Sequence, residues 1–129
     1  MIDLTGYWRT SAMLDDECDE EFLFLSDGTG AGTDRFASGH LSVWDIKWQF
    51  VDGVLTVWNM DSIGGTPHIN NAATLTENYF DINDPEWSDG GIVDVLDLKE
   101  YCKLYRHVSR SRNDDKLRLI IKELKRYSH

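Results

Sequence analysis

Residues 40–59, HLSVWDIKWQFVDGVLTVWN, alternate between polar and apolar side chains through a turn and out again. One parity carries the large apolar side chains Trp44, Ile46, Trp48 and Phe50. This repeat of two is the period of a β-strand, and it predicts that the four side chains share one buried face. Asp52-Gly53 tolerates positive φ and the pattern resumes after it, which predicts a β-hairpin. A two-stranded ribbon is not stable alone, so other segments should complete its sheet.

Further short strand patterns occupy most of the chain before residue 109. The expected strands lie at residues 7–13, 22–25, 32–37, 73–76, 79–82, 93–98 and 101–108, with loops at 60–71 and 83–91. Residues 60–71 read as a loop because they hold Gly64-Gly65, Pro67 and paired asparagines, and a turn is expected near Glu77-Asn78. Together these segments predict a mainly β domain, an antiparallel barrel or half-barrel of about eight strands.

The last segment changes to a helical period. Leu117, Ile120, Ile121 and Leu124 recur at helical spacing, with N-cap candidates at residues 113–115 and basic residues near the C-terminal end. An amphipathic helix is therefore expected at residues 113–128, and its apolar stripe should dock on the barrel.

Length and composition favour one domain. A chain of 129 residues, 41% of them hydrophobic, supports one core, so residues 1–129 are expected to form a single domain, with the barrel in 1–109. The apolar runs are far shorter than a membrane span and the start MIDLTGYW resembles no signal peptide, which favours a cytoplasmic protein. In that compartment Cys18 and Cys102 are expected to be free thiols.

The order of these pieces resembles a known family. Gly6-Tyr7-Trp8 is similar to the GxW motif of lipocalins, and FLSDGTG at residues 24–30 resembles a strand and turn of small bacterial lipocalin-like proteins. A tryptophan-rich strand before a GxLxV strand, and a late strand bearing Arg106, also fit that pattern. The resemblance covers residues 6–108 and implies an up-and-down antiparallel barrel around a ligand cavity. The acidic insert at residues 14–21, the 60–71 loop and the C-terminal helix depart from it.

Charge is strongly segregated. The formal net charge is −10, but residues 1–100 carry 20 acidic against 4 basic residues, whereas residues 101–129 carry 3 acidic against 9 basic residues. Such an acidic body should repel nucleic acid and attract cationic partners. An acidic excess that serves only solubility is the alternative reading.

No constellation of catalytic or metal-binding residues stands out. The four histidines lie in separate segments, no GxSxG elbow occurs, and Cys18 lies among carboxylates that would suppress its reactivity. The acidic segment at residues 81–92 lacks the glycine and the final glutamate of an EF-hand loop. We therefore expect no catalytic residues, no metal site and no cofactor.

Two functions remain in view, with an enzyme as a distant third. A small acidic domain without a catalytic site resembles the immunity proteins of bacterial toxin systems, including contact-dependent growth inhibition. Such an antitoxin would cover the active site of a cationic toxin, a nuclease or RNase, with an acidic surface. The expected partner-binding residues are Asp15, Asp16, Glu17, Asp19, Glu20 and Glu21, or else Asp84, Glu86 and Asp89 around the anchor Trp87. The alternative is a lipocalin-like carrier of a small apolar ligand, lined by Trp44, Trp48, Phe50 and Trp58.

Overall fold

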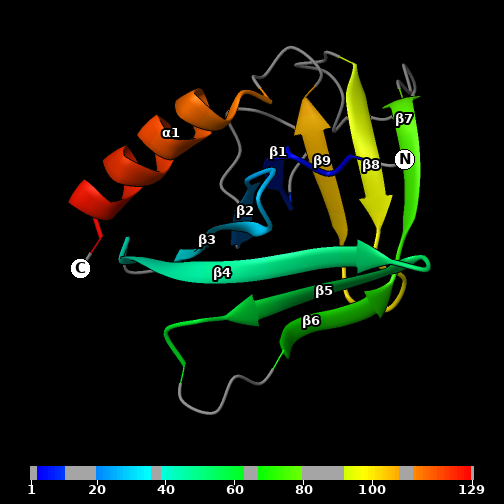
Figure 1. Ribbon diagram of the computed structural model, residues 1–129, viewed down its shortest axis with the longest axis horizontal. Coiled ribbons are helices and arrows are strands. Elements are labelled where there is room, and N and C mark those ends of the chain that lie inside the picture. Colours follow the sequence, from blue (N-terminus) through cyan, green and yellow to red (C-terminus); the bar gives the residue numbers. More distant parts are fainter. Residues whose placement is uncertain are drawn as a thin grey trace.

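Nine strands and one helix make up the part of the chain that the computed structural model describes, residues 3–10, 20–35, 39–62, 67–79, 92–107 and 112–128 (Figure 1). The strands are β1 (Gly6–Arg9), β2 (Glu20–Phe24), β3 (Thr29–Arg35), β4 (Leu41–Val51), β5 (Val54–Asn59), β6 (Pro67–Ala72), β7 (Thr74–Tyr79), β8 (Val93–Asp97) and β9 (Lys103–His107). The helix α1 spans Asp114–Arg126. This mainly β composition with one C-terminal helix confirms the expected fold class.

The strands form one antiparallel sheet in the order β6-β5-β4-β3-β2-β1-β9-β8-β7. Its two outer strands, β6 and β7, follow each other in the chain with only Ala73 between them, and Figure 1 shows the chain bending sharply from one to the other. They act as one bent strand, whose first half pairs with β5 and whose second half pairs with β8. This bend nearly closes the sheet into an up-and-down barrel. Counting β6 and β7 as one strand, the barrel has eight strands, which is compatible with a lipocalin-like fold.

The central hairpin has the expected turn and the expected facing. Asp52 and Gly53 have φ values of 53° and 75°, which the primed two-residue turn requires, and β4 and β5 pair from Val51↔Val54 onward. Trp44 and Ile46 are buried in the main core, and Trp48 and Phe50 pack against it. The period-two reading of residues 40–59 is therefore confirmed.

The barrel interior is filled by its own side chains. The core cluster holds Leu4, Trp8, Phe22, Phe24, Trp44, Ile46, Leu55, Val57, Ile69, Ala73, Leu96, Leu98 and Leu104. Its aromatic rings are in mutual contact, with Phe22 edge-on to Trp44 at 5.9 Å and Phe24 at 4.9 Å from Trp48. An eight-stranded barrel has an interior only wide enough for such side chains or one small ligand, so these rings take up the space that a ligand would need.

The helix α1 covers the outside of the barrel next to β1 and β2, as Figure 1 shows at its upper left. Asn113 caps it by accepting from the backbone N–H groups of Asp115 and Lys116. Leu117 is fully buried against Leu23 and Leu25, which point outward from β2 and its end. Ile120, Ile121 and Leu124 pack beside it, so the predicted stripe does dock on the barrel.

Three boundaries differ from the expectation. Residues 67–72 form β6 and not part of a loop, because Pro67 takes the first position of the strand, where a missing N–H is tolerated. The turn expected near Glu77-Asn78 is a bulge inside β7, where Asn78 has a φ of 55° and the register with β8 shifts. The third strand, β3, starts at Thr29, three residues earlier than expected.

Candidate functional site

Neighbouring strands alternate in direction, so the strand ends lie at two opposite ends of the barrel. We call one the Tyr101 end; it holds the start of β2, the end of β3, the start of β6 and the turn between β8 and β9. The other, the Arg106 end, holds the start of β8 and the end of β9. Each end contains a cluster of polar side chains.

Four polar residues meet at the Tyr101 end: Glu20, Asp34, His68 and Tyr101. The Tyr101 hydroxyl donates to the Glu20 carboxylate, with 2.9 Å to each oxygen. His68 Nε2 lies 3.3 Å from that hydroxyl oxygen and 3.5 Å from Glu20 Oε1, so a proton on Nε2 can be donated to either. The cluster therefore joins β2, β6 and the β8–β9 turn, segments up to 81 residues apart.

The same contacts shift the titration of these groups. The hydrogen bond to Glu20 raises the pKa of His68 above its ordinary 6.5, although partial burial opposes the shift. Burial, reinforced by the charge of Glu20, raises the pKa of Asp34. Desolvation also raises the pKa of Tyr101, with the Glu20 carboxylate adding to the effect. The cluster thus favours the protonated form of His68 and the neutral form of the Tyr101 phenol.

Aromatic side chains form the floor of this cluster. The His68 ring lies 4.9 Å from the Trp44 ring and 6.2 Å from the Phe22 ring. The Trp44 indole lies over Gly32, where an added Cβ would come within 2.5 Å of it. Trp44 is only 4% exposed and its Nε1–H has no hydrogen-bond acceptor. It nevertheless acts on the Asp34 carboxyl and opposes part of the rise in the pKa of that group.

The chemistry of this cluster depends on the nearby thiol, the two carboxylates and the aromatic rings. The nearby thiol of Cys102 has its pKa raised to about 12 by burial and by Glu20, so the thiolate that a nucleophile needs is not populated. Within the described ranges, no three His, Cys, Asp or Glu side chains are placed to hold a metal ion. What the cluster does offer is two carboxylates beside flat aromatic rings, which suits a cationic group.

The Arg106 end carries a buried network with a structural role. Arg106 contacts Asp94 at 2.8 Å, and both side chains are 1% exposed. Its Nη1 donates to the backbone oxygens of Asp3 and Thr5, and its guanidinium lies 4.5 Å above the Trp8 ring. Trp8 and Arg106, which carry the lipocalin-like resemblance, thus contact each other and close this end.

The residues that the sequence marked for partner binding fall into two groups. Glu20 belongs to the Tyr101 cluster, whereas Glu21 is 2% exposed and accepts from Thr33 and Arg35, so it does not offer its carboxylate to a partner. The others, Asp15, Asp16, Glu17, Asp19, Asp84, Glu86, Trp87 and Asp89, lie outside the described residues. Thr10 and Glu20, which flank the first acidic segment, lie at the Tyr101 end, and Tyr79 and Ile92, which flank the second, lie at the Arg106 end.

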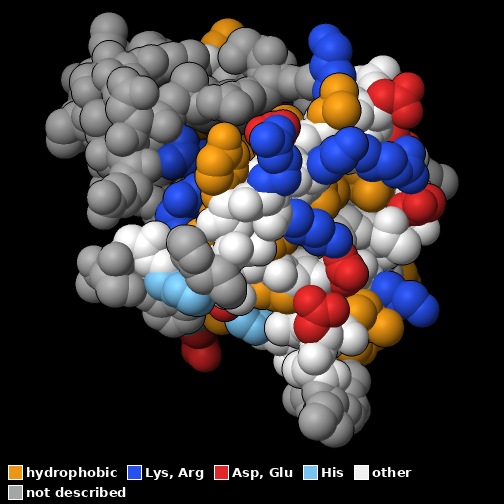
Figure 2. All heavy atoms as spheres, turned by 90° about the vertical axis from the view of Figure 1, so that its left-hand side faces the viewer, with side chains coloured by type: hydrophobic (Ala, Val, Ile, Leu, Met, Phe, Trp, Pro, Cys, Tyr) orange, Lys and Arg blue, Asp and Glu red, His pale blue; other side chains and the backbone are white. Residues whose placement is uncertain are grey.

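The outer face of α1 is basic. Its exposed cations are Lys116, Arg118, Lys122, Lys125 and Arg126. Figure 2 looks at the left-hand side of Figure 1, where α1 lies, and shows Lys and Arg side chains gathered on that face. Two of them pair with carboxylates of the barrel, Arg118 with Asp27 at 3.4 Å and Lys125 with Asp45 at 2.8 Å. The C-terminal helix therefore neutralises part of the acidity of the barrel.

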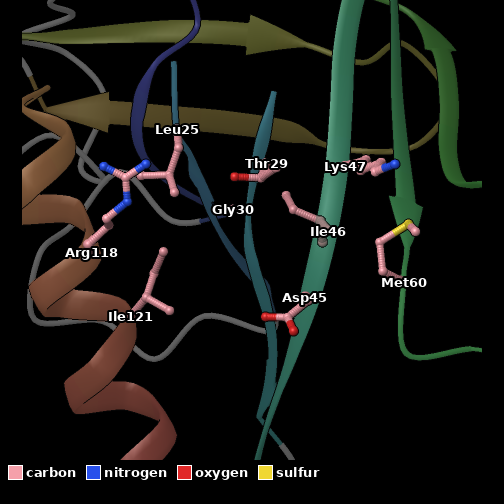
Figure 3. A pocket seen from close by; sticks show the side chains of 9 residues that line it. All are labelled: Leu25, Thr29, Gly30, Asp45, Ile46, Lys47, Met60, Arg118 and Ile121. Carbon is pink, nitrogen blue, oxygen red and sulfur yellow. The ribbon is translucent and has the colours of Figure 1, made fainter. Parts of the chain in front are cut away.

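Shallow apolar grooves run along both sides of α1. One, of about 360 Å³, lies between the helix residues Arg118 and Ile121 and the barrel residues Leu25, just after β2, and Ile46 in β4 (Figure 3). The other, of about 500 Å³, lies between Leu41 at the start of β4 and the helix residues Leu119 and Tyr127. Both lie outside the barrel.

The comparisons add no relative. No family model, no curated protein and no solved structure matches this chain. Among the helices in the described part of the chain, none is both long and apolar enough to cross a membrane.

Proposed function

We propose that this protein is an immunity protein, an antitoxin that binds a cationic bacterial toxin and covers its active site with an acidic surface. The toxin class that fits is a nuclease or RNase of the kind delivered by contact-dependent growth inhibition, since its cleft must be basic to bind nucleic acid. Carboxylates of the antitoxin would take the place of phosphates. The proposal is a binding function and not an enzyme activity.

The charge distribution carries this proposal. Residues 11–19 and 80–91 hold eight of the 23 acidic residues and no lysine or arginine. Several carboxylates of the barrel, by contrast, already have basic partners of their own, such as Asp27, Asp45 and Asp94. In the sequence the acidic residues are thus densest in the two segments, and Glu20 at the Tyr101 end continues the first of them. Concentrated acidic surfaces speed association with basic partners.

A carrier of a small apolar ligand is the second candidate. The filled interior argues against a ligand inside the barrel, but the two apolar grooves beside α1 favour one outside it. Native mass spectrometry of the purified protein distinguishes the two functions. A tightly bound stoichiometric lipid or fatty acid would favour the carrier.

The direct test is coexpression with the candidate toxin, followed by growth and by binding kinetics at low and high salt. One variant neutralises the first segment, with Asp15→Asn, Asp16→Asn, Glu17→Gln and Asp19→Asn. A second removes three of the four acidic charges of the other segment, with Asp84→Asn, Glu86→Gln and Asp89→Asn. We expect one of them to slow association at least about tenfold and to weaken its salt dependence. Trp87→Ala should instead speed dissociation, because buried tryptophans act as interface anchors.

Asp52→Asn is the matched control. Asp52 is exposed in the β4–β5 turn, and asparagine tolerates its positive φ, so this change removes a charge without disturbing the fold. Protection by all variants with unchanged kinetics would place the interface elsewhere. A search that finds no basic protein partner would leave the carrier as the better function.

A further inference from the structure

Two like charges are placed directly opposite each other at the Tyr101 end. Glu20 and Asp34 are cross-strand partners in β2 and β3, and Glu20 shares the inward parity of Phe22 and Phe24. Side chains at such positions have Cβ atoms about 5 Å apart, so two carboxylates there repel each other. His68 offsets this repulsion only in part, because it contacts Glu20 and no ion pair joins it to Asp34 among the described contacts.

A buried hydrogen-bond donor lies beside this pair. The indole N–H of Trp44 has no acceptor although Trp44 is 4% exposed, and a buried N–H without a partner is uncommon. Asp34 is a candidate acceptor, because the indole acts on its carboxyl and lowers its pKa. Asp34 would make that hydrogen bond best when ionised, and its pKa is raised by burial and then by the neighbouring charge of Glu20.

We infer that the Tyr101 end is a binding site for the guanidinium group of an arginine side chain that a partner protein inserts between Glu20 and Asp34. The cation offsets the repulsion between the two carboxylates and favours the ionised form of Asp34, which is the better acceptor for the Trp44 N–H. An arginine fits better than a lysine, because a planar guanidinium donates to two carboxylates and stacks on the ring of Tyr101. A metal ion fits less well, since no metal-binding group of three side chains occurs among the described residues.

This inference rests on the proposed function, since it names the group of the toxin that is recognised. It makes Glu20, Asp34, Trp44, His68 and Tyr101 a preformed receptor at the edge of the first acidic segment. The acidic segments would then attract the toxin, and the receptor would fix its orientation through one arginine.

The experiment is a titration of the full chain, followed by nuclear magnetic resonance, with N-acetyl-arginine methylamide as the probe. The uncharged citrulline analogue is the matched control, because its urea group has nearly the same shape. We expect the arginine probe to bind with a dissociation constant on the order of 1 mM. The Trp44 indole N–H resonance should shift saturably, and the pKa of His68 should fall, because the added cation disfavours the imidazolium.

Variants of the two carboxylates complete the test. Glu20→Gln and Asp34→Asn should each weaken probe binding at least about tenfold, whereas Glu100→Gln, at the same end but outside the cluster, should leave it unchanged. No Trp44 shift up to about 100 mM probe, an equal shift with citrulline, or full binding by both carboxylate variants would overturn the site. Equal binding of a lysine probe would overturn the preference for guanidinium.

The two proposals fail separately. If the arginine probe binds but no toxin is neutralised, the receptor stands and the antitoxin function falls. If a toxin is neutralised equally well by wild type, Glu20→Gln and Asp34→Asn, the antitoxin function stands and the receptor falls.

Discussion

Gly32 and Trp44 face each other across β3 and β4, and the indole occupies the space above the glycine. A Cβ at position 32 would lie 2.5 Å from Cη2 of Trp44, inside van der Waals contact. We expect Gly32→Ala to lower the free energy of unfolding by about 1–3 kcal/mol, because the ring is buried and has little room to move. Urea denaturation measures this change.

A second substitution shows whether the ring is the cause. In a Trp44→Phe background the smaller ring leaves room for a methyl group, so Gly32→Ala should cost clearly less there. An equal cost in both backgrounds would mean that the glycine is needed for its backbone and not for the indole.

The titration of His68 should be visible in the stability of the protein. Its folded pKa is raised above the ordinary 6.5 by Glu20, so its contribution is fully present below about pH 6.5 and is lost as the pH rises through the folded value. The melting temperature should therefore fall between about pH 6 and about pH 9 more steeply for wild type than for His68→Gln. Glu20→Gln should flatten the profile in the same way, because it removes the group that raises the pKa. Parallel profiles for all three proteins would contradict the contact.

The Tyr101 cluster marks the limit of sequence reasoning at this scale. Glu20, Asp34, His68 and Tyr101 come from four separate strands or turns, and no local spacing connects them. Glu20 stood out only as part of an acidic run, and each histidine looked isolated. The one usable signal was the alternation in β2 and β3, which aligns Glu20 with Asp34 once the register of the two strands is known.

At the scale of elements, α1 is held on the barrel by the apolar side of the helix that includes Leu117. Leu117 is fully buried, whereas Leu119 is 62% exposed two residues later. Leu117→Ala should destabilise the protein by about 3 kcal/mol through the cavity it leaves, while Leu119→Ala should change stability by less than about 0.5 kcal/mol. Thermal unfolding of both variants tests the docking. Equal effects would mean that α1 does not rest on the barrel through this stripe.

Elements with a strong period were predictable, and the bent strand was not. The hairpin of β4 and β5 and the helix α1 each carry a long apolar repeat. The period of such a repeat indicates the type of secondary structure and the face that is buried. The strand β6 reads PHINNA, whose proline and asparagines favour turns, and its pairing with β5 overrides that preference. Gly64 and Gly65 also favour a loop, and they come just before β6 starts, so the sequence predicts a loop over residues 60–71.

At the scale of the whole molecule, the pair of Arg106 and Asp94 ties distant parts of the chain together. Arg106 in β9 donates to the backbone oxygens of residues 3 and 5, and Asp94 in β8 also pairs with Arg112, just before the helix. Arg106→Met should destabilise the protein by about 3 kcal/mol, because it also leaves a buried carboxylate with only the half-exposed Arg112 as a basic partner among the described ion pairs. Adding Asp94→Leu should recover part of this loss. A double variant that is worse than the sum of the single variants would contradict a pairwise origin.

The position of β1 between β2 and β9 has a consequence for how the chain is made. The first strand leaves the ribosome early, but its second neighbour is encoded about a hundred residues later. Until residue 107 has emerged, Trp8 lacks the guanidinium that covers it, and the edge of β1 stays open to other nascent chains. The barrel closes only after its last strand has been synthesised. Slow translation, or a stop codon before β9, should therefore leave an open sheet that binds a chaperone or a second copy of the chain.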